Sequence, residues 1–221
     1  MTSSARPADL RSAPASDVRV AVFAKAPVPG EVKTRLAPLL GEEGAAHLHA
    51  ALVRRTLAVA AESGVGRVEL WCSPTASHPL FAACAAEFGA ALRVQRGADL
   101  GQRMRAAFDA ALGENAALVL IGCDCPALDA AMLREAAAAL AHHDAVIAPA
   151  EDGGYVLVGL SRQHPGIFAG VEWGGSSVMA DTRARLERAG ARWKELETLW
   201  DIDRPEDYAR LEREGLLRDL R

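Results

Sequence analysis

Residues 18–36 read VRVAVFAKAPVPGEVKTRL, and this stretch decides the fold. It opens with an apolar run in which Val20 and Val22 are β-branched and Phe23 is aromatic. Such a run is typical of a buried β-strand. Because prolines and a glycine follow it closely, the strand cannot extend far into the loop, and no helix can begin there.

The loop after this strand is rich in positive charge. Lys25, Lys33 and Arg35 lie in it, together with Pro29 and Gly30. A cationic loop directly after a first buried strand is typical of a phosphate site at the edge of a parallel sheet, because lysine and arginine both pair with phosphate oxygens. We therefore predict that this loop binds a phosphorylated ligand; solvated charges on a surface loop are the alternative. Neither GxxxxGK[ST] nor GxGxxG occurs in it.

Composition restricts the class of protein. The chain has 221 residues, of which 50% are hydrophobic, and a formal net charge of −4. This size and composition favour one α/β domain, residues 18–221, preceded by a disordered extension, residues 1–17. The negative net charge argues against a nucleic-acid partner.

The cysteines and the apolar runs indicate the compartment. Four cysteines occur without zinc or disulfide spacing, which favours a reducing, cytoplasmic setting. No apolar run approaches the roughly 20 residues of a membrane span. The first 17 residues have no apolar segment of the secretory type. Whether the protein is a monomer or a homodimer stays open.

Strand-like and helix-like segments alternate along the chain. This alternation predicts a three-layer α/β/α fold with a mainly parallel central sheet. The expected strands are 18–24, 67–72, 91–95, 117–121, 145–149, 155–160 and 192–197, and the expected helices are 41–63, 77–88, 100–112, 129–141, 176–189 and 205–214. Ser77 is the expected N-cap of the second helix.

The sequence GCDCP follows the most apolar of these strands and places Asp124 at its end. A carboxylate beside a phosphate loop suits Mg²⁺ or Mn²⁺, so we predict that Asp124 is a metal ligand. The alternative is that Asp124 only caps the turn before Pro126. We interpret Cys123 and Cys125 as small, half-buried side chains.

A second acidic motif, DIDRPEDY, spans residues 201–208. Asp203 is either a second ligand to the same ion or only the N-cap of the following helix. Glu206 and Asp207 are explained by their favourable position in the first turn of that helix.

Three further segments carry candidate ligand contacts. Asp99 and Gly101 begin a helix whose amides could face a ligand, and Arg103 could reach a phosphate; an ordinary surface helix start is the alternative. Glu151 and Asp152 could bind an acceptor hydroxyl, and Gly153 and Gly154 allow close approach of the backbone or simply form a turn. We add Tyr155 to this acceptor set, and Trp173, which could stack on a ligand ring or only pack. His47 and His49 are interpreted as solvated.

Together, KAPVPGEVKTRL, GCDCP and DIDRPEDY resemble the nucleotide-diphospho-sugar transferase superfamily with the GT-A fold. QRGADLGQRM and PAEDGGYVLVGL extend this resemblance from residue 18 to about residue 208. The chain is most similar to the radical-SAM/selenodomain-associated transferases, described as glycosyltransferase-like, and is akin to 2-phospho-L-lactate guanylyltransferase.

The resemblance implies roles for individual residues. Lys33 and Arg35 match contacts to nucleotide phosphates, Asp124 matches the metal-binding aspartate after the fourth strand, and Asp203 matches the position that completes the metal site. Residues 99–101 fall near the segment that holds the base. The sequence departs from this superfamily at two places. In the first loop, Pro27, Pro29 and Gly30 replace the GG-x-S-x-R-MG pattern of the molybdenum-cofactor guanylyltransferases. In GCDCP, only one carboxylate of the Asp-x-Asp of glycosyltransferases is present.

Three functions are compatible with these features. The first is a Mg²⁺- or Mn²⁺-dependent nucleotidylyltransferase with Lys33, Arg35 and Asp124 in catalytic roles; it would join an NTP to a small phosphorylated or hydroxylated acceptor and release pyrophosphate. The second is a glycosyltransferase that uses an NDP-sugar, with Asp152 as candidate acidic residue. The third is a non-catalytic nucleotide-binding protein.

Overall fold

The computed structural model describes residues 17–164 and 166–220. The extension expected over residues 1–17 lies outside this range except for Asp17, which belongs to the first strand and not to an extension. Asp17 pairs with Ala116 in the sheet register, and this backbone pairing extends the strand by one residue toward the N-terminus.

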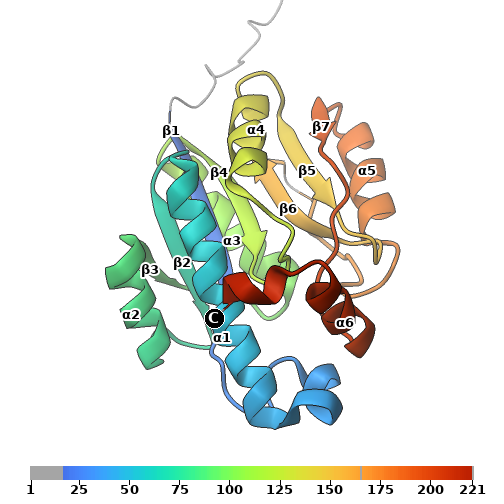
Figure 1. Cartoon of the computed structure of the whole chain (residues 1–221). Helices are drawn as coiled ribbons and strands as arrows, with labels where there is room; N and C mark the ends of the chain where they lie inside the picture. The colour runs from blue at the N-terminus through green and yellow to red at the C-terminus, as the bar shows by residue number, and fades with distance from the viewer. Residues whose placement is uncertain (1–16, 165, 221) are drawn as a thin grey trace, which may run out of the picture.

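Seven strands form one sheet in the order β3-β2-β1-β4-β6-β5-β7 (Figure 1). Strand β6 is antiparallel to β4 and β5, and the other pairs are parallel. The reversal follows from a short connection between β5 and β6, in which the N–H of Ala150 donates to Gly154 O at 3.0 Å. The strands are β1 (Asp17–Lys25), β2 (Val68–Ser73), β3 (Ala91–Val94), β4 (Ala116–Gly122), β5 (Ala145–Pro149), β6 (Tyr155–Leu160) and β7 (Trp193–Glu195).

The expected helices are present with small changes at their ends. They are α1 (Ala37–Ser63), α2 (Pro79–Phe88), α3 (Leu100–Gly113), α4 (Ala130–Leu140), α5 (Val178–Arg188) and α6 (Pro205–Arg213), with single-turn helices η1 (Thr34–Leu36) and η2 (Leu216–Leu220). Within the described ranges, no helix combines the length and apolarity that a bilayer crossing requires.

Two helix starts differ from the expectation. Helix α1 begins earlier, at Ala37, and is interrupted at Gly41, whose φ of 72° is outside the helical region. The N-cap of α2 is His78 and not Ser77, because Nδ1 of His78 accepts the N–H of Leu80 at 3.2 Å. Asp99 and Asp129 are the N-caps of α3 and α4, and their carboxylates accept the N–H groups of Gln102 and Met132, each at 2.8 Å.

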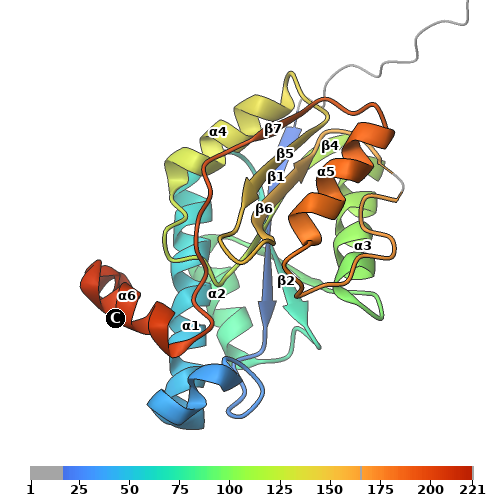
Figure 2. The same ribbon diagram turned by 90° about the vertical axis from the view of Figure 1, so that its right-hand side faces the viewer.

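Helices cover both faces of the sheet (Figure 2), and alternation along the strands divides the core between these faces. On one face, Val20, Val22 and their neighbours pack under α1, α2 and α4. On the other, Ala21, Phe23 and Trp71 pack under α3 and α5. This arrangement confirms the three-layer α/β/α expectation.

The strand order reverses direction at β1. Strands β2 and β3 continue on one side of β1, and β4 returns to its other side. In open α/β sheets, ligands bind outside the carboxyl ends of the strands at such a switch point. Lys25 ends β1 and Gly122 ends β4, so the cationic loop and the GCDCP motif meet at this edge.

A third apolar cluster fixes the C-terminal segment to the cationic loop. Leu36 from η1 is fully buried with Leu52 of α1 and with Trp200, Ile202 and Leu211. Figure 1 shows α6 beside the lower part of α1. The apolar contacts of Leu36 therefore hold the loop that carries Lys33 and Arg35.

Leu36→Ala should destabilise the protein by about 2–5 kcal/mol, because it removes a fully buried side chain and leaves a cavity. Leu39→Ala is the matched control: Leu39 is 53% exposed, and its loss should change stability by less than about 0.5 kcal/mol. Urea denaturation measures both, and equal effects would contradict the anchoring role of Leu36.

Candidate functional site

Lys33 is the buried centre of the switch-point edge. Its side chain is 5% exposed, and its Nζ lies 2.7 Å from Asp124 Oδ1. The same Nζ donates to the carbonyl of Ile202 at 2.5 Å. Lys33 has φ 48° and ψ 38°, a left-handed conformation that costs a lysine on the order of 1–3 kcal/mol. The surrounding contacts thus hold this side chain in place against a backbone cost.

The charges of Lys33 and Asp124 stabilise each other. Burial lowers the pKa of Lys33, but Asp124 more than offsets this, so its pKa is raised. Burial likewise raises the pKa of Asp124, while Lys33 and then His49 lower it, and the net pKa is below its usual value. Both groups are therefore ionised at neutral pH.

His49 is a residue of this site that the sequence analysis did not predict. The expectation of a solvated side chain is wrong, because His49 is 4% exposed; His47 is exposed as expected. Its Nε2 lies 2.9 Å from Lys25 O and must donate there, since a carbonyl only accepts. Burial lowers the pKa of His49, so the ring is neutral and Nδ1 keeps its lone pair, 3.8 Å from Asp124 Oδ1. Ala45 and Leu52 share this helix face, and their spacing was the available signal.

Arg35 and Asp203 form a second ion pair at this edge. The alternative role of Asp203 as an N-cap does not hold: the cap of α6 is Arg204, and Asp207 Oδ2 accepts the N–H groups of Asp203 and Arg204. The Asp203 carboxylate therefore does not cap the helix, and it pairs with Arg35 of the cationic loop.

Each cation of the loop has an acidic partner in the described structure. Lys25, 47% exposed, lies 3.7 Å from Glu31 and does not contact Asp124. Pro29 and Gly30 form the exposed turn of the loop, where Gly30 has φ 76°. The inner quartet, Lys33, Arg35, Asp124 and Asp203, carries equal numbers of positive and negative charges.

The donor set near Asp124 suits a divalent ion. Among the described residues, His49, Cys123 and Asp124 bring one ligand atom each to within 4.8 Å of one another, and the Asp203 carboxylate, predicted as a second ligand, is not part of this group. Cys123 and Cys125 are both 3% exposed, so both are fully buried and not half-buried. Burial raises the pKa of Cys123 well above normal, so this thiol stays protonated. The Asp124 carboxylate and the imidazole lone pair of His49 would then be available to hold Mg²⁺ or Mn²⁺.

A cavity of about 230 Å³ adjoins this edge on the α3 and α5 side of the sheet. Four of the five predicted acceptor residues line it: Asp152, Gly154, Tyr155 and Trp173. Gly153 does not line it but supports its wall, since a Cβ there would lie 2.2 Å from Ser176 O. Tyr155 and Trp173 meet edge to face with ring centroids 6.3 Å apart.

Asp201 also lines this cavity, although the sequence pattern favoured only Asp203 of the pair. Burial, then the negative charges of Asp152 and Asp124, raises the pKa of Asp201 to about 6. Its position follows from the neighbouring Ile202, whose N–H donates to Asp124 O at 2.8 Å and so ties this segment to GCDCP.

The predicted residues at the start of α3 have structural partners. Asp99 accepts the N–H and the side-chain amide of Gln102, each at 2.8 Å. Arg103 donates to Ser73 Oγ at 3.3 Å. A Cβ on Gly101 would lie 2.8 Å from Trp173 Nε1, so the glycine lets the indole pack against this helix.

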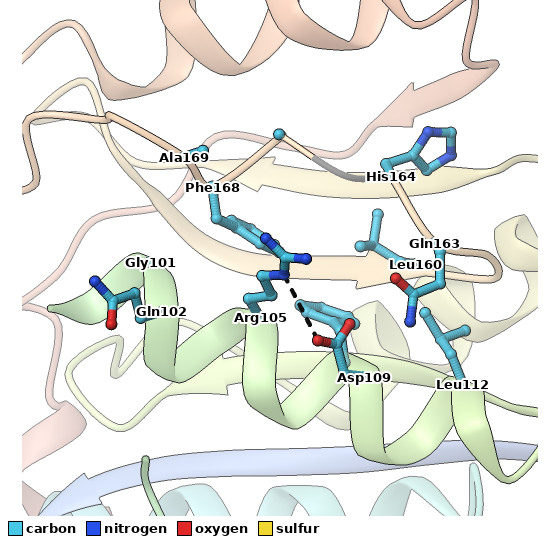
Figure 3. Close-up of a pocket in the computed structure, with 12 residues that line it drawn as sticks. Gly101, Gln102, Arg105, Asp109, Leu112, Leu160, Gln163, His164, Phe168 and Ala169 are labelled. Atoms are coloured by element: carbon cyan, nitrogen blue, oxygen red, sulfur yellow. Dashed lines mark ion pairs between the residues drawn. The ribbon is translucent and has the colours of Figure 1, made fainter. Parts of the chain in front are cut away.

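A smaller cavity, of about 80 Å³, lies between α3 and the segment after β6 (Figure 3). Arg105 and Asp109 pair across its floor at 3.6 Å, and Phe108 stacks on Phe168. Of the predicted site residues, only Gly101 lines this cavity. Of the predicted contacts, Lys33, Arg35, Asp124 and Asp203 lie at the switch point, and the acceptor residues lie at the larger cavity.

Residues 56–175 match the family of uncharacterised proteins conserved in bacteria known as DUF2064. The chain belongs to this family. The match runs from Thr56 in α1 to Gly175, so it includes GCDCP and most of the residues that line the larger cavity, but not Phe23, Val178 or Asp201. No curated protein matches the chain significantly.

Solved structures place this DUF2064 protein among known folds. A protein from Desulfovibrio desulfuricans G20, described as a nucleotide-diphospho-sugar transferase, has a structure similar to this one, with 29% sequence identity and a TM-score of 0.78. The alignment covers 91% of this chain and 94% of that protein's chain. CMP:2-keto-3-deoxy-manno-octonic acid synthetase in complex with CTP is 13% identical over 92% and 100%, with a TM-score of 0.56. Rv0371c of Mycobacterium tuberculosis H37Rv with manganese is 20% identical over 89% and 98%, with a TM-score of 0.51. The superfamily resemblance is confirmed at the level of fold.

Asp124→Asn should destabilise this DUF2064 protein, because it leaves the buried Lys33 ammonium without its charged partner. Since 46% of the Asp124 side chain is exposed, the loss should stay below the about 3–5 kcal/mol seen when a fully buried pair is broken. Combining it with Lys33→Met should recover part of the loss, with a coupling energy of about 0.5–3 kcal/mol.

Urea denaturation of the two single variants and the double variant measures this coupling. The control is the pair Arg54 and Glu87, both 44% exposed, whose coupling should be under about 1 kcal/mol. Strictly additive losses for Lys33 and Asp124 would contradict a functional ion pair at this edge.

Proposed function

We propose that this protein is a cytoplasmic, divalent-metal-dependent transferase that uses a nucleotide donor, and specifically a nucleotidylyltransferase. The supporting observation is the quartet at the switch point, where Lys33 contacts Asp124 and Arg35 contacts Asp203. The transferase names of the solved structures with the same fold agree with this proposal. The four cysteines, all unpaired, suit a reducing compartment.

The charge balance of the quartet explains why a metal ion would be needed. The positive and negative charges cancel, so the quartet alone attracts a polyphosphate weakly. A divalent ion on Asp124 and Asp203, with His49 beside them, would supply net positive charge, neutralise phosphate oxygens and orient the attacking oxygen. Nucleotide binding should therefore depend on the ion.

The residues of the loop would act on the leaving group. In nucleotidyl transfer an acceptor oxygen bonds to the α-phosphorus, and the bond from that phosphorus to the bridging β-oxygen breaks. Pyrophosphate leaves with the bonding electron pair. Lys33 and Arg35 would stabilise the charge that develops on it, while the buried position of Lys33 keeps its donor oriented beforehand.

A glycosyltransferase is the second candidate function. The cavity beside Asp124 favours it, because Asp152 lies at a site where it could accept the proton of an attacking hydroxyl. The leaving group would then be an NDP in place of pyrophosphate. A non-catalytic nucleotide-binding protein would bind nucleotides without turning over any acceptor.

A thermal-shift panel of NTPs and NDP-sugars, with Mg²⁺ and with EDTA, tests the class of ligand. A nucleotide present at 100 times its Kd should stabilise the fold by about 2.7 kcal/mol. For a protein of this size the Tm should rise by about 5–11 °C. The shift should disappear in EDTA, and equal shifts in both buffers would contradict metal dependence.

Arg35→Ala should lower pyrophosphate release from the NTP found in that panel by about 100-fold, because a donor to the leaving group is lost. Folding should be little affected, since Arg35 is 63% exposed. Arg54→Ala on α1 is the control and should keep full activity. Unchanged turnover in Arg35→Ala would refute this role, and NDP release from an NDP-sugar would identify the second candidate function.

A further inference from the structure

The larger cavity has an apolar interior. Leu120 of β4 and Val158 of β6 line it together with Phe23 at the end of β1. Met104 of α3 and Val178 of α5 add to the wall. Its volume of about 230 Å³ is below the roughly 300–1,000 Å³ of sites for drug-sized ligands. The space therefore suits one ring of a ligand and not a whole nucleotide.

The charged groups of this cavity are of one sign. Among the described residues that line it, the charged ones are Asp152 and Asp201, and none is lysine, arginine or histidine. An ionised carboxylate accepts hydrogen bonds but donates none. It therefore binds hydroxyl groups well and repels phosphate oxygens.

Backbone donors near the cavity are also engaged. The N–H of Gly154 donates to Asp152 Oδ1 at 2.8 Å, and that of Gly175 to Glu172 O at 3.3 Å. At the start of α5, the N–H of Met179 donates to Gly153 O at 2.8 Å. These amides cannot hold a phosphate in place of the missing cations.

An aromatic face completes the cavity. Trp173 is half-buried, and its indole is held between Tyr155 and the start of α3, where Gly101 leaves room for it. A fixed indole offers an apolar face to the C–H groups of a ring while the carboxylates take its hydroxyls.

We propose that this cavity binds an uncharged, polyhydroxylated ring of the sugar type, held by Asp152 and Asp201 and packed on Trp173, and that it excludes a phosphorylated ring. The proposal rests on the proposed function and narrows its substrate: the acceptor, or the group transferred from an NDP-sugar, carries hydroxyls and no phosphate in this position. The first loop contributes no residue to the cavity, so phosphate and ring recognition are separate.

Tryptophan fluorescence and calorimetry of the full chain with Mg²⁺ test this inference. The probes are D-glucose, D-mannose and D-ribose, each against its monophosphate, with and without UDP or GDP. A second arm compares UDP-glucose and GDP-mannose with UDP and GDP. At least one uncharged sugar should bind tenfold or more tightly than its phosphate. If a sugar nucleotide binds more tightly than its NDP, the ring belongs to the donor. If the free sugar binds, the ring belongs to the acceptor.

The variants make the test specific to the cavity. Trp173→Phe should remove the sugar-dependent fluorescence change, and Trp173→Ala should weaken binding about tenfold. Asp152→Asn keeps an oxygen for the Gly154 turn and, like Asp201→Asn, should reduce the preference for the uncharged ring about tenfold. Asp109→Asn, in the smaller cavity, is the control and should change nothing.

Tighter binding of the sugar phosphates, an unchanged preference in both aspartate variants, or no binding of any uncharged ring overturns the inference. Binding of UDP or GDP in the same Mg²⁺ buffer is measured separately and reports on the proposed function. Failure of the nucleotide arm and failure of the ring arm are thus distinguishable.

Discussion

The contact on which the rest of this edge depends is the one between Lys33 and Asp124, fastened by Ile202. Lys33 donates to the carbonyl of Ile202, while the N–H of Ile202 donates to Asp124 O. The Ile202 side chain is fully buried beside Leu36. One residue of the C-terminal segment therefore fixes the first loop and the end of β4 together.

This arrangement makes the edge rigid and keeps its charged groups oriented toward a ligand. The apolar contacts of Leu36 and Ile202 supply stability, so the charged groups do not have to. Lys33 can then remain in a costly backbone conformation, because its position is determined by its neighbours. Strain held by surrounding packing is common where a protein orients charge for a ligand.

Much of the fold could be predicted from the sequence, because its signals are local. Short, continuous apolar runs such as residues 145–149 and 155–160 marked strands with the observed bounds, and Asp99 and Asp129 marked helix starts. The prediction that Ser77 caps α2 was wrong, because the side chain of the neighbouring His78 accepts the N–H of Leu80 instead. The long helix was misjudged at Gly41, where a single positive φ interrupts it without ending it.

The candidate site was less predictable, because its decisive contacts join distant residues. The charges of Lys33, Arg35, Asp124 and Asp203 were visible, but their pairing spans up to 168 positions and no local pattern encodes it. For the same reason the neutralisation of the loop cations could not be foreseen. His49 was missed because a histidine in an alanine-rich helix looks the same whether it faces water or the core, and only the helical stripe with Leu52 distinguishes the two.

The tie between Lys33 and Ile202 also bears on how the protein is made. The two residues are 169 positions apart, so at about 5–20 residues per second a ribosome needs roughly 10–30 s to synthesise the second after the first. Throughout that interval the growing polypeptide presents the lysine loop without the segment that orients it. The edge can therefore be completed only after Ile202 has been synthesised, and a shorter nascent chain cannot hold a ligand there in the final geometry.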